Sequence, residues 1–244
     1  MNEPVFLQCG DSALIVEFSK EISDSVNILI RAFDAAIKKK NINGIVETVP
    51  TFRSLSVYYN PLLISSQKLT KKLKNVLKGV SATAQSERTV IEIPVLYGGE
   101  YGEDLPDVAK HTGLSEEEVI KLHSSAEYLI YMLGFLPGFA YLGGMDPRLE
   151  TPRLQNPRTK IHMGAVGIGG AQTGIYPLAS PGGWRLIGTT PVKPYDPDRE
   201  QPFLYSAGDY IKFFSVDEDE FNRIKESVDK NEYKCTVRKE GAAK

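Results

Sequence analysis

The most constraining feature of this chain is the crowding of glycine and proline into one segment, from Gly134 to Pro191. This segment holds 12 of the 21 glycines and 7 of the 15 prolines. Glycine permits positive φ and proline fixes φ, so this density predicts many tight turns between short strands. Phe135, Phe139 and Trp184 lie within the segment, whereas disordered linkers carry few such rings. We therefore predict an ordered, turn-rich region that holds the functional site.

The bulk composition is that of a globular protein with room for two domains. The 244 residues are 41% hydrophobic and 25% charged, with a net charge of -2. This charge argues against a nucleic-acid partner, which would require a basic patch. No apolar run approaches the ~20 residues that span a bilayer, and no positively charged leader precedes one, so we expect no membrane association and a cytoplasmic location. The two cysteines and three histidines show no ligand spacing, and no metal site is expected.

The first part of the chain follows the order β, α, β, β, α, β. Apolar residues at helical spacing predict helices over residues 26–37 and 69–80, and alternation predicts a final strand over 89–95. Because proline cannot donate to a strand ladder, Pro94 predicts a sheet edge or a strand end. Two helices on one face of an antiparallel sheet form the ferredoxin-like pattern, and we place this domain at residues 1–86.

The second predicted domain covers residues 87–244 and follows a polar link at 81–88. It opens with short helices at 104–111 and 115–123, and a last helix follows the cap residue Asp217. Short strands between glycine and proline turns predict a barrel or a sandwich. These strands are expected at 128–133, 139–142, 165–168, 174–176, 184–189, 203–205 and 210–214.

Candidate binding residues lie in the glycine- and proline-rich segment. Arg153 and Arg158 lie at the ends of an extended stretch, where their guanidinium groups suit either a carboxylate or phosphate ligand or surface salt bridges. Trp184 follows Gly182 and Gly183, whose N–H groups could receive an anion beside an aromatic wall. A tryptophan buried in the core is the alternative interpretation.

A glycine-rich stretch at residues 167–174 lacks the dinucleotide-binding and phosphate-loop fingerprints. It is therefore either a turn between strands or a loop that lines a ligand. Gln172 within it can donate and accept hydrogen bonds to a lactam, a carboxamide or a peptide. Phe135, Tyr176 and Arg185 complete the candidate set. No motif places a nucleophile, a carboxylate or a histidine, so catalytic residues are not assigned.

Four motifs in this segment occur together. They are GFLPGFAYL at 134–142, the proline–arginine pairs at 152–153 and 157–158, QTGIYP at 172–177 and SPGGW at 180–184. With GDSAL at 10–14, the chain resembles the KipI family, whose members are also called the B subunit of 5-oxoprolinase or allophanate hydrolase subunit 1. The resemblance covers nearly the whole chain and thins after Phe214.

This resemblance implies a ferredoxin-like N-terminal domain followed by a cyclophilin-like β-barrel. It implies one component of ATP-dependent 5-oxoprolinase, which opens the lactam of 5-oxo-L-proline to L-glutamate with ATP hydrolysis. Such a B subunit works with the homologous C subunit of 5-oxoprolinase and with its A subunit. It takes ATP as a co-substrate together with these partners, and is expected to be inactive alone. The alternatives are an inhibitor of a sporulation sensor histidine kinase and a subunit of an allophanate- or urea-processing enzyme.

For the lactam reaction, we expect Arg153 or Arg158 to hold the ring carboxylate, since a guanidinium pairs well with this group. Gln172 and the Gly182–Gly183 backbone are expected to bind the lactam or its activated intermediate. The aromatic side chains of Phe135, Tyr176 and Trp184 are expected to wall the pocket.

Overall fold

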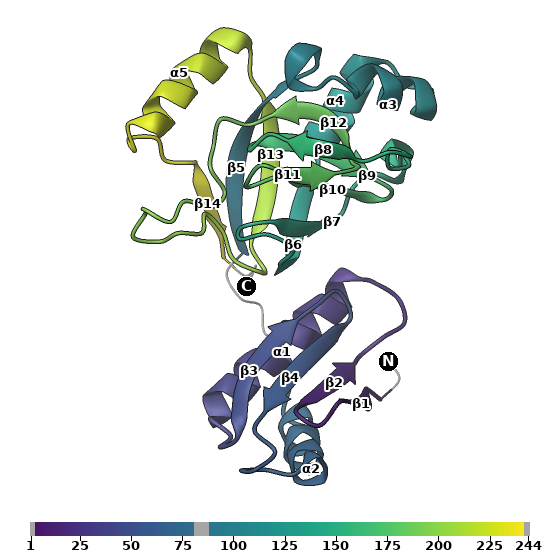
Figure 1. Ribbon diagram of the computed structural model, residues 1–244, viewed down its shortest axis with the longest axis vertical. Helices are drawn as coiled ribbons and strands as arrows, with labels where there is room; N and C mark the ends of the chain where they lie inside the picture. The colour runs from purple at the N-terminus through teal and green to yellow at the C-terminus, as the bar shows by residue number, and fades with distance from the viewer. Residues whose placement is uncertain (1–2, 81–87, 242–244) are drawn as a thin grey trace. The chain divides into compact units, whose positions relative to one another are not determined.

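The computed structural model describes residues 3–80 and 88–241, and the chain divides into two compact units, Met1–Ser86 and Glu87–Lys244 (Figure 1). Each unit has a hydrophobic core of its own. The link expected at residues 81–88 lies outside the described residues except for Arg88. Within the described ranges, every helix is too short or too polar to cross a bilayer.

The first unit is a four-stranded antiparallel sheet in the order β1-β2-β4-β3, covered by two helices (Figure 1). The hydroxyls of Ser23 and Ser65 accept backbone N–H groups at the two helix N-termini, as capping residues do. Apolar residues of the helices and of the strands, such as Phe33 and Leu55, meet in a core without solvent exposure. The elements are β1 (Val5–Cys9), β2 (Ala13–Glu17), α1 (Asp24–Lys40), β3 (Ile45–Pro50), β4 (Ser54–Tyr59) and α2 (Ser66–Leu77).

The strand predicted to close this sheet lies elsewhere, so that part of the prediction is wrong. Residues Arg88–Tyr97 form β5 of the second unit, and β1 pairs with β2 at the edge of the first sheet. Successive residues of a strand point to opposite faces, and the adjacent Val90 and Ile91 are both buried. A strand buried on both faces needs a core on each side, which a four-stranded sheet with an open face does not supply.

Pro94 does not mark a sheet edge, which corrects a second expectation. On one side of β5, the antiparallel partner changes from β14 (Val237–Glu240), paired with residues 88–91, to β12 (Arg185–Thr189), paired with residues 96–97. Pro94 falls between these two partners, where a missing N–H donor breaks neither ladder.

The second unit is built around an eight-stranded sheet that nearly closes into a barrel, as the turn pattern predicted. The strands follow the path β10-β9-β12-β5-β13-β6-β7, and the terminal strands β10 and β7 contact each other. Helices α3 and α4 pack against the sheet, and Tyr128, Phe213 and Ile93 are buried in the core. The further elements are α3 (Leu105–Thr112), α4 (Glu116–Ser125), β6 (Glu127–Leu133), β7 (Ala140–Gly143), β9 (Ala165–Gly169), β10 (Gln172–Ile175), β13 (Tyr210–Ser215) and α5 (Glu218–Asp229).

Three strands of this unit were not predicted, and one predicted strand is absent. β8 (Arg158–Ile161) and β11 (Ser180–Gly182) form a separate two-stranded sheet, too short for a periodic signal. β14 carries charged residues. Its Arg238 forms ion pairs with Glu92 of β5 and Glu127 of β6, which lie far from it in the sequence. The expected strand at 203–205 is reduced to an isolated bridge between Tyr195 and Phe203. Long-range pairing, rather than local pattern, decides these short segments.

Candidate functional site

Six of the nine predicted binding residues line one cavity of about 140 Å³ in the second unit. The cavity is formed by the β6–β7 loop, β7, the stretch before β8, the residue after β10, and β11 with the two residues that follow it. The lining residues are Phe135, Phe139, Tyr141, Arg153, Tyr176, Pro181, Gly182, Gly183 and Trp184. We call this space the aromatic cavity.

The walls of the aromatic cavity are rings that pack edge to face. Trp184 is 5% exposed, and its ring centroid lies 5.6 Å from that of Phe139 and 6.1 Å from that of Tyr176. The rings of Phe139 and Tyr176 are 5.8 Å apart and steeply inclined to each other. Such arrangements place the positive edge of one ring against the negative face of the next. Trp184 is therefore both a core residue and a cavity wall, so the two interpretations of its role hold together.

The glycine-rich stretch at 167–174 makes room for the Trp184 ring. A Cβ added at Gly169 would lie 2.4 Å from the indole, and one at Gly174 would lie 3.2 Å from it. Similarly, a Cβ at Gly182 would lie 2.4 Å from the hydroxyl of Tyr176. These glycines are required by the close approach of large rings.

Phe135 stands at the mouth of the aromatic cavity in an unfavourable backbone conformation. Its φ is +67°, its side chain is 66% exposed, and its ring lies 5.5 Å from that of Phe139. A bulky residue with positive φ costs free energy and persists only where its surroundings impose it. Here the loop is held by backbone hydrogen bonds between Gly134 and Phe139 and by the Tyr205 hydroxyl, which donates to the carbonyl of Gly138. These hydrogen bonds thus hold the backbone of Phe135 at the entrance.

Arg153 is the cation of the aromatic cavity. Its Cζ lies 5.8 Å from the centroid of the Trp184 ring, within cation–π range. In the described part of the chain, no carboxylate lies within 4.0 Å of this exposed guanidinium. Burial raises the pKa of the Tyr176 hydroxyl, against opposing effects of the Trp184 backbone and of Arg153, so the phenol remains neutral near pH 7. The cavity therefore presents one unpaired positive charge.

Arg158 and Arg185 do not line the aromatic cavity, and carboxylates engage both. The Nη2 of Arg158 donates to Asp104 Oδ1 at 2.9 Å, and its Nε lies 3.0 Å from Glu103. The hydrogen bond to Asp104 raises the pKa of Arg158. Arg185 Nη1 donates to Asp107 at 2.7 Å. The salt-bridge alternative thus describes Arg158 in this structure.

Gln172 also lies outside the lining of the aromatic cavity. It begins β10 opposite Gly169, at the turn between β9 and β10. By contrast, Phe139 and Tyr141 line the cavity but were not among the predicted binding residues. Their signal was available, because both belong to the motif at 134–142 that also contains Phe135. They were missed because the prediction took Phe135, Tyr176 and Trp184 as the aromatic walls and assigned residues 139–142 only to a strand.

The aromatic cavity has no obvious group for proton transfer at neutral pH. Its lining contains an arginine and two tyrosines as ionisable residues, with no carboxylate or histidine. Across residues 3–80 and 88–241, no group of three His, Cys, Asp or Glu side chains is arranged to hold a metal ion. The arrangement can hold a small anion against aromatic walls, whereas general acid–base chemistry requires groups from elsewhere.

The chain matches one known protein family over most of its length. Residues 4–205 match the family model of the carboxyltransferase domain, subdomains C and D. The B subunit of 5-oxoprolinase from Bacillus subtilis is 43% identical over 90% of this chain and 95% of that protein, and the one from Escherichia coli is 40% identical over 84% and 92%. The chain therefore belongs to the carboxyltransferase-domain family that includes the B subunits of 5-oxoprolinase, which confirms the resemblance seen in its motifs.

A solved structure of a larger enzyme contains the same fold. The crystal structure of the Kluyveromyces lactis urea carboxylase is 22% identical and matches with a TM-score of 0.79 over 97% of this chain. The chain corresponds to 24% of that longer protein. The same architecture thus occurs as one part of a larger polypeptide.

Proposed function

We propose that this chain is the B subunit of an ATP-dependent 5-oxoprolinase, which opens the lactam of 5-oxo-L-proline to L-glutamate with ATP hydrolysis. The observation that carries this proposal is the 43% identity to the B subunit of a 5-oxoprolinase over 95% of that relative's length. The name of the relative implies further subunits, and we propose the A and C subunits of 5-oxoprolinase as partners. The cytoplasm, which holds ATP, is the proposed location.

In this proposal the aromatic cavity holds the substrate. Its volume of about 140 Å³ lies below the usual range of ligand pockets, which favours a small substrate such as a five-membered ring with one carboxylate. Arg153 pairs with the ring carboxylate, since a guanidinium without a protein partner gains most from an anion. The rings of Tyr176 and Trp184 border the apolar carbons of the substrate, and the Gly182–Gly183 backbone approaches it closely because no Cβ intervenes.

The same proposal assigns the ATP chemistry and the proton transfers to the complete complex. Opening an unstrained lactam is unfavourable without an activating step, and the aromatic cavity supplies no acid or base for it. The glycine-rich stretch at 167–174 packs against Trp184, so we place the phosphates of ATP with the partner subunits. The isolated chain is accordingly expected to release no glutamate.

We also propose the finer fold assignments. The nearly closed barrel of the second unit, antiparallel except for the parallel pair of β5 and β13, supports a cyclophilin-like topology. In the first unit, β2, α1 and β3 form a split βαβ unit with β4 between the two strands, which supports a variant of the ferredoxin-like fold. In this variant, β1 occupies the edge position beside β2 that a strand following α2 holds in the ferredoxin-like pattern.

The test is glutamate and ADP release by the complex reconstituted from this chain and its partner subunits. Arg153→Gln is expected to lower kcat/KM for 5-oxoproline about 10- to 100-fold, as for loss of a charge-assisted hydrogen bond. Arg223→Gln is the matched control, because Arg223 is an exposed arginine on α5 outside the aromatic cavity. Full activity of the folded Arg153 variant would remove the aromatic cavity from the proposal.

The same complex separates the substrate classes. Allophanate and urea are offered beside 5-oxoproline, and ADP release is measured for each. The proposal expects turnover with 5-oxoproline alone. Turnover with allophanate or urea, and none with 5-oxoproline, would assign the chain to a urea-processing enzyme instead.

A further inference from the structure

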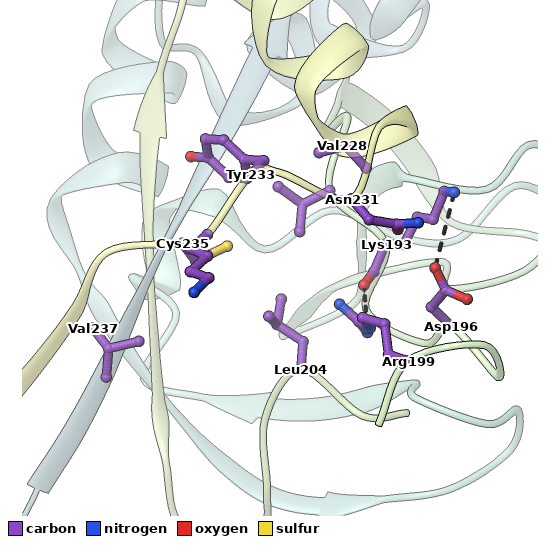
Figure 2. A pocket seen from close by; sticks show the side chains of 11 residues that line it. Lys193, Asp196, Arg199, Leu204, Val228, Asn231, Tyr233, Cys235 and Val237 are labelled. Carbon is purple, nitrogen blue, oxygen red and sulfur yellow. Dashed lines mark hydrogen bonds and ion pairs between the residues drawn. The ribbon is translucent and has the colours of Figure 1, made fainter. Parts of the chain in front are cut away.

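A second cavity of the barrel unit, of about 420 Å³, lies between residues 192–204 and the segment 228–237, where α5 ends and leads to β14 (Figure 2). It shares no lining residue with the aromatic cavity. Its volume falls in the range of small-molecule sites. We call it the C-terminal cavity, and its chemistry can be considered independently of the proposed reaction.

One side of the C-terminal cavity is apolar. Figure 2 shows Leu204, Val228 and Cys235 around a common space, with Val237 at its edge. Val237 is 51% exposed, so the cavity opens to solvent at β14. Covering apolar surface of this kind with a bound ligand is favourable because it removes the surface from water.

Arg199 gives the opposite side of the C-terminal cavity an uncompensated charge. Its Nη2 donates to the carbonyls of Pro202 at 2.9 Å and Lys193 at 3.0 Å. Its Nε is buried and has no hydrogen-bond partner, and no carboxylate in the described part of the chain lies within 4.0 Å of the guanidinium. A buried donor without a partner costs stability, and carbonyl groups do not neutralise a positive charge. Arg199 is therefore held rigidly beside the cavity with its charge unpaired.

The remaining charged groups do not cancel this excess. Lys193 lies 3.9 Å from a carboxylate oxygen of Asp196 and 4.0 Å from one of Asp229, which are long ion pairs. Lys234 also lines the cavity. Three cations, Arg199, Lys193 and Lys234, face two carboxylates, Asp196 and Asp229. The net charge is +1, so an anionic ligand is favoured over a cation.

We propose that the C-terminal cavity binds a small organic carboxylate with a compact apolar body, its carboxylate beside Arg199 and its body against Leu204, Val228 and Cys235. An inorganic anion would leave the apolar side wet, and a neutral molecule would leave the guanidinium unpaired. Both parts of the ligand are thus specified by the lining. The site is separate from the aromatic cavity and does not depend on the proposed reaction.

The experiment measures protection of Cys235 from alkylation in the full chain. Cys9 is also a free cysteine, so all proteins carry Cys9→Ser. Burial raises the pKa of the Cys235 thiol to about 11, so iodoacetamide is applied at about pH 9 to obtain a measurable rate. The probe is phenylacetate, with phenylacetamide as its neutral isostere and acetate as an anion without the apolar body.

We expect phenylacetate to slow alkylation of Cys235 with a dissociation constant of about 1 mM, and both control compounds to bind at least about tenfold more weakly. Arg199→Gln should raise the constant about tenfold. Val237→Trp, which adds bulk at an exposed edge, should abolish protection without disturbing the core. Arg223→Gln lies outside the cavity and should leave protection unchanged.

Three results would overturn the proposal. The first is an absence of protection up to about 20 mM phenylacetate. The second is equal protection of Cys235 by phenylacetate and phenylacetamide. Unaltered protection by phenylacetate in the Val237→Trp protein or in a folded Arg199→Gln protein counts as the same contradiction. The third is quenching of Trp184 fluorescence without protection of Cys235, which would place the probe in the aromatic cavity. Circular dichroism establishes folding, and Val237→Trp decides the matter if Arg199→Gln does not fold.

Discussion

Two neighbouring regions of the barrel unit use arginine in different ways. At the mouth of the aromatic cavity, Arg153 lies over the Trp184 ring without a carboxylate partner among the described residues. At the start of β8, Arg158 pairs with Asp104 and Glu103. Both arginines follow a proline in the same short stretch of sequence. Charged partners, and not the residue type or its local motif, therefore separate a ligand-holding arginine from a structural one.

The two arginines should therefore have opposite mutational consequences. Asp104 is 5% exposed and also accepts the backbone N–H of Leu186 at 2.6 Å, so it links Arg158 to β12. Loss of Arg158 would leave this carboxylate without its cation, which destabilises the fold. Loss of Arg153 removes only an exposed charge, so its effect should fall on ligand binding.

The largest effect is expected for Trp184→Ala, because this ring joins the core to the aromatic cavity. Removing a buried tryptophan leaves a void beside Gly169 and Gly174 and should lower the free energy of unfolding by about 3–5 kcal/mol. Urea denaturation followed by circular dichroism measures this change. Trp184→Phe serves as control and should lose less. A loss below about 1 kcal/mol would show that the ring is a dispensable lid and not a core residue.

Arg158→Gln tests the structural side of the comparison. We expect the free energy of unfolding to fall by about 1–3 kcal/mol, since Asp104 keeps the Leu186 N–H but loses its charged partner. Arg158→Lys should recover part of this loss, because the charge returns without the paired donors. If Arg158→Gln keeps native stability but the complex loses glutamate release, Arg158 is a substrate-binding residue. That result would contradict the distinction between Arg153 and Arg158.

The barrel interior also buries a histidine, His123, and satisfies its ring by hydrogen bonds. His123 Nδ1 lies 2.8 Å from the hydroxyl of Tyr97, and its Nε2 lies 2.8 Å from that of Thr173. The Thr173 hydroxyl donates to the carbonyl of Gly167, so its oxygen accepts a hydrogen bond from Nε2–H of His123. Nδ1 then accepts a hydrogen bond from the Tyr97 hydroxyl. Burial lowers the pKa of His123 to about 3. The network is complete only while the imidazole is neutral.

This network predicts a pH dependence of stability. The folded pKa lies below the ordinary value of 6.5, so the unfolded state binds the proton more tightly. The contribution of His123 is fully present above about pH 6.5 and is lost as the pH falls toward about 3, with a slope of up to about 1.4 kcal/mol per pH unit. Urea denaturation of wild type and of His123→Gln between about pH 4 and 7 measures the difference in slope. Equal slopes of stability against pH for wild type and His123→Gln would contradict this prediction.

The smallest stability effects are expected at the mouth of the aromatic cavity. Arg153→Gln and Phe135→Ala should each change the free energy of unfolding by about 0.5 kcal/mol or less, because both side chains are exposed. Thermal unfolding of each variant is compared with wild type. A loss above about 1 kcal/mol at Arg153 would place it with Arg158 among the structural arginines.

Local signals were sufficient for several elements of the fold. The helix starting at Ser115 and the cap Asp217 were predicted because a helix start depends on residues within one turn, and the structure shows a capping box of Ser115 with Glu118. The strand over 89–95 was also recognised, but its sheet was not. Which sheet a strand joins depends on partners such as β12 and β13, and these follow it by about 100 residues.

By itself, the sequence determined that one segment would hold tight turns, aromatic walls and an arginine, because glycine, proline and ring content act locally. Tertiary structure alone decided which arginine faces the aromatic cavity. The carboxylate that engages Arg158 comes from Asp104, 54 positions away in the chain, and no such group reaches Arg153 within the described residues. Charge pairing depends on distance in space, which the order of residues does not state.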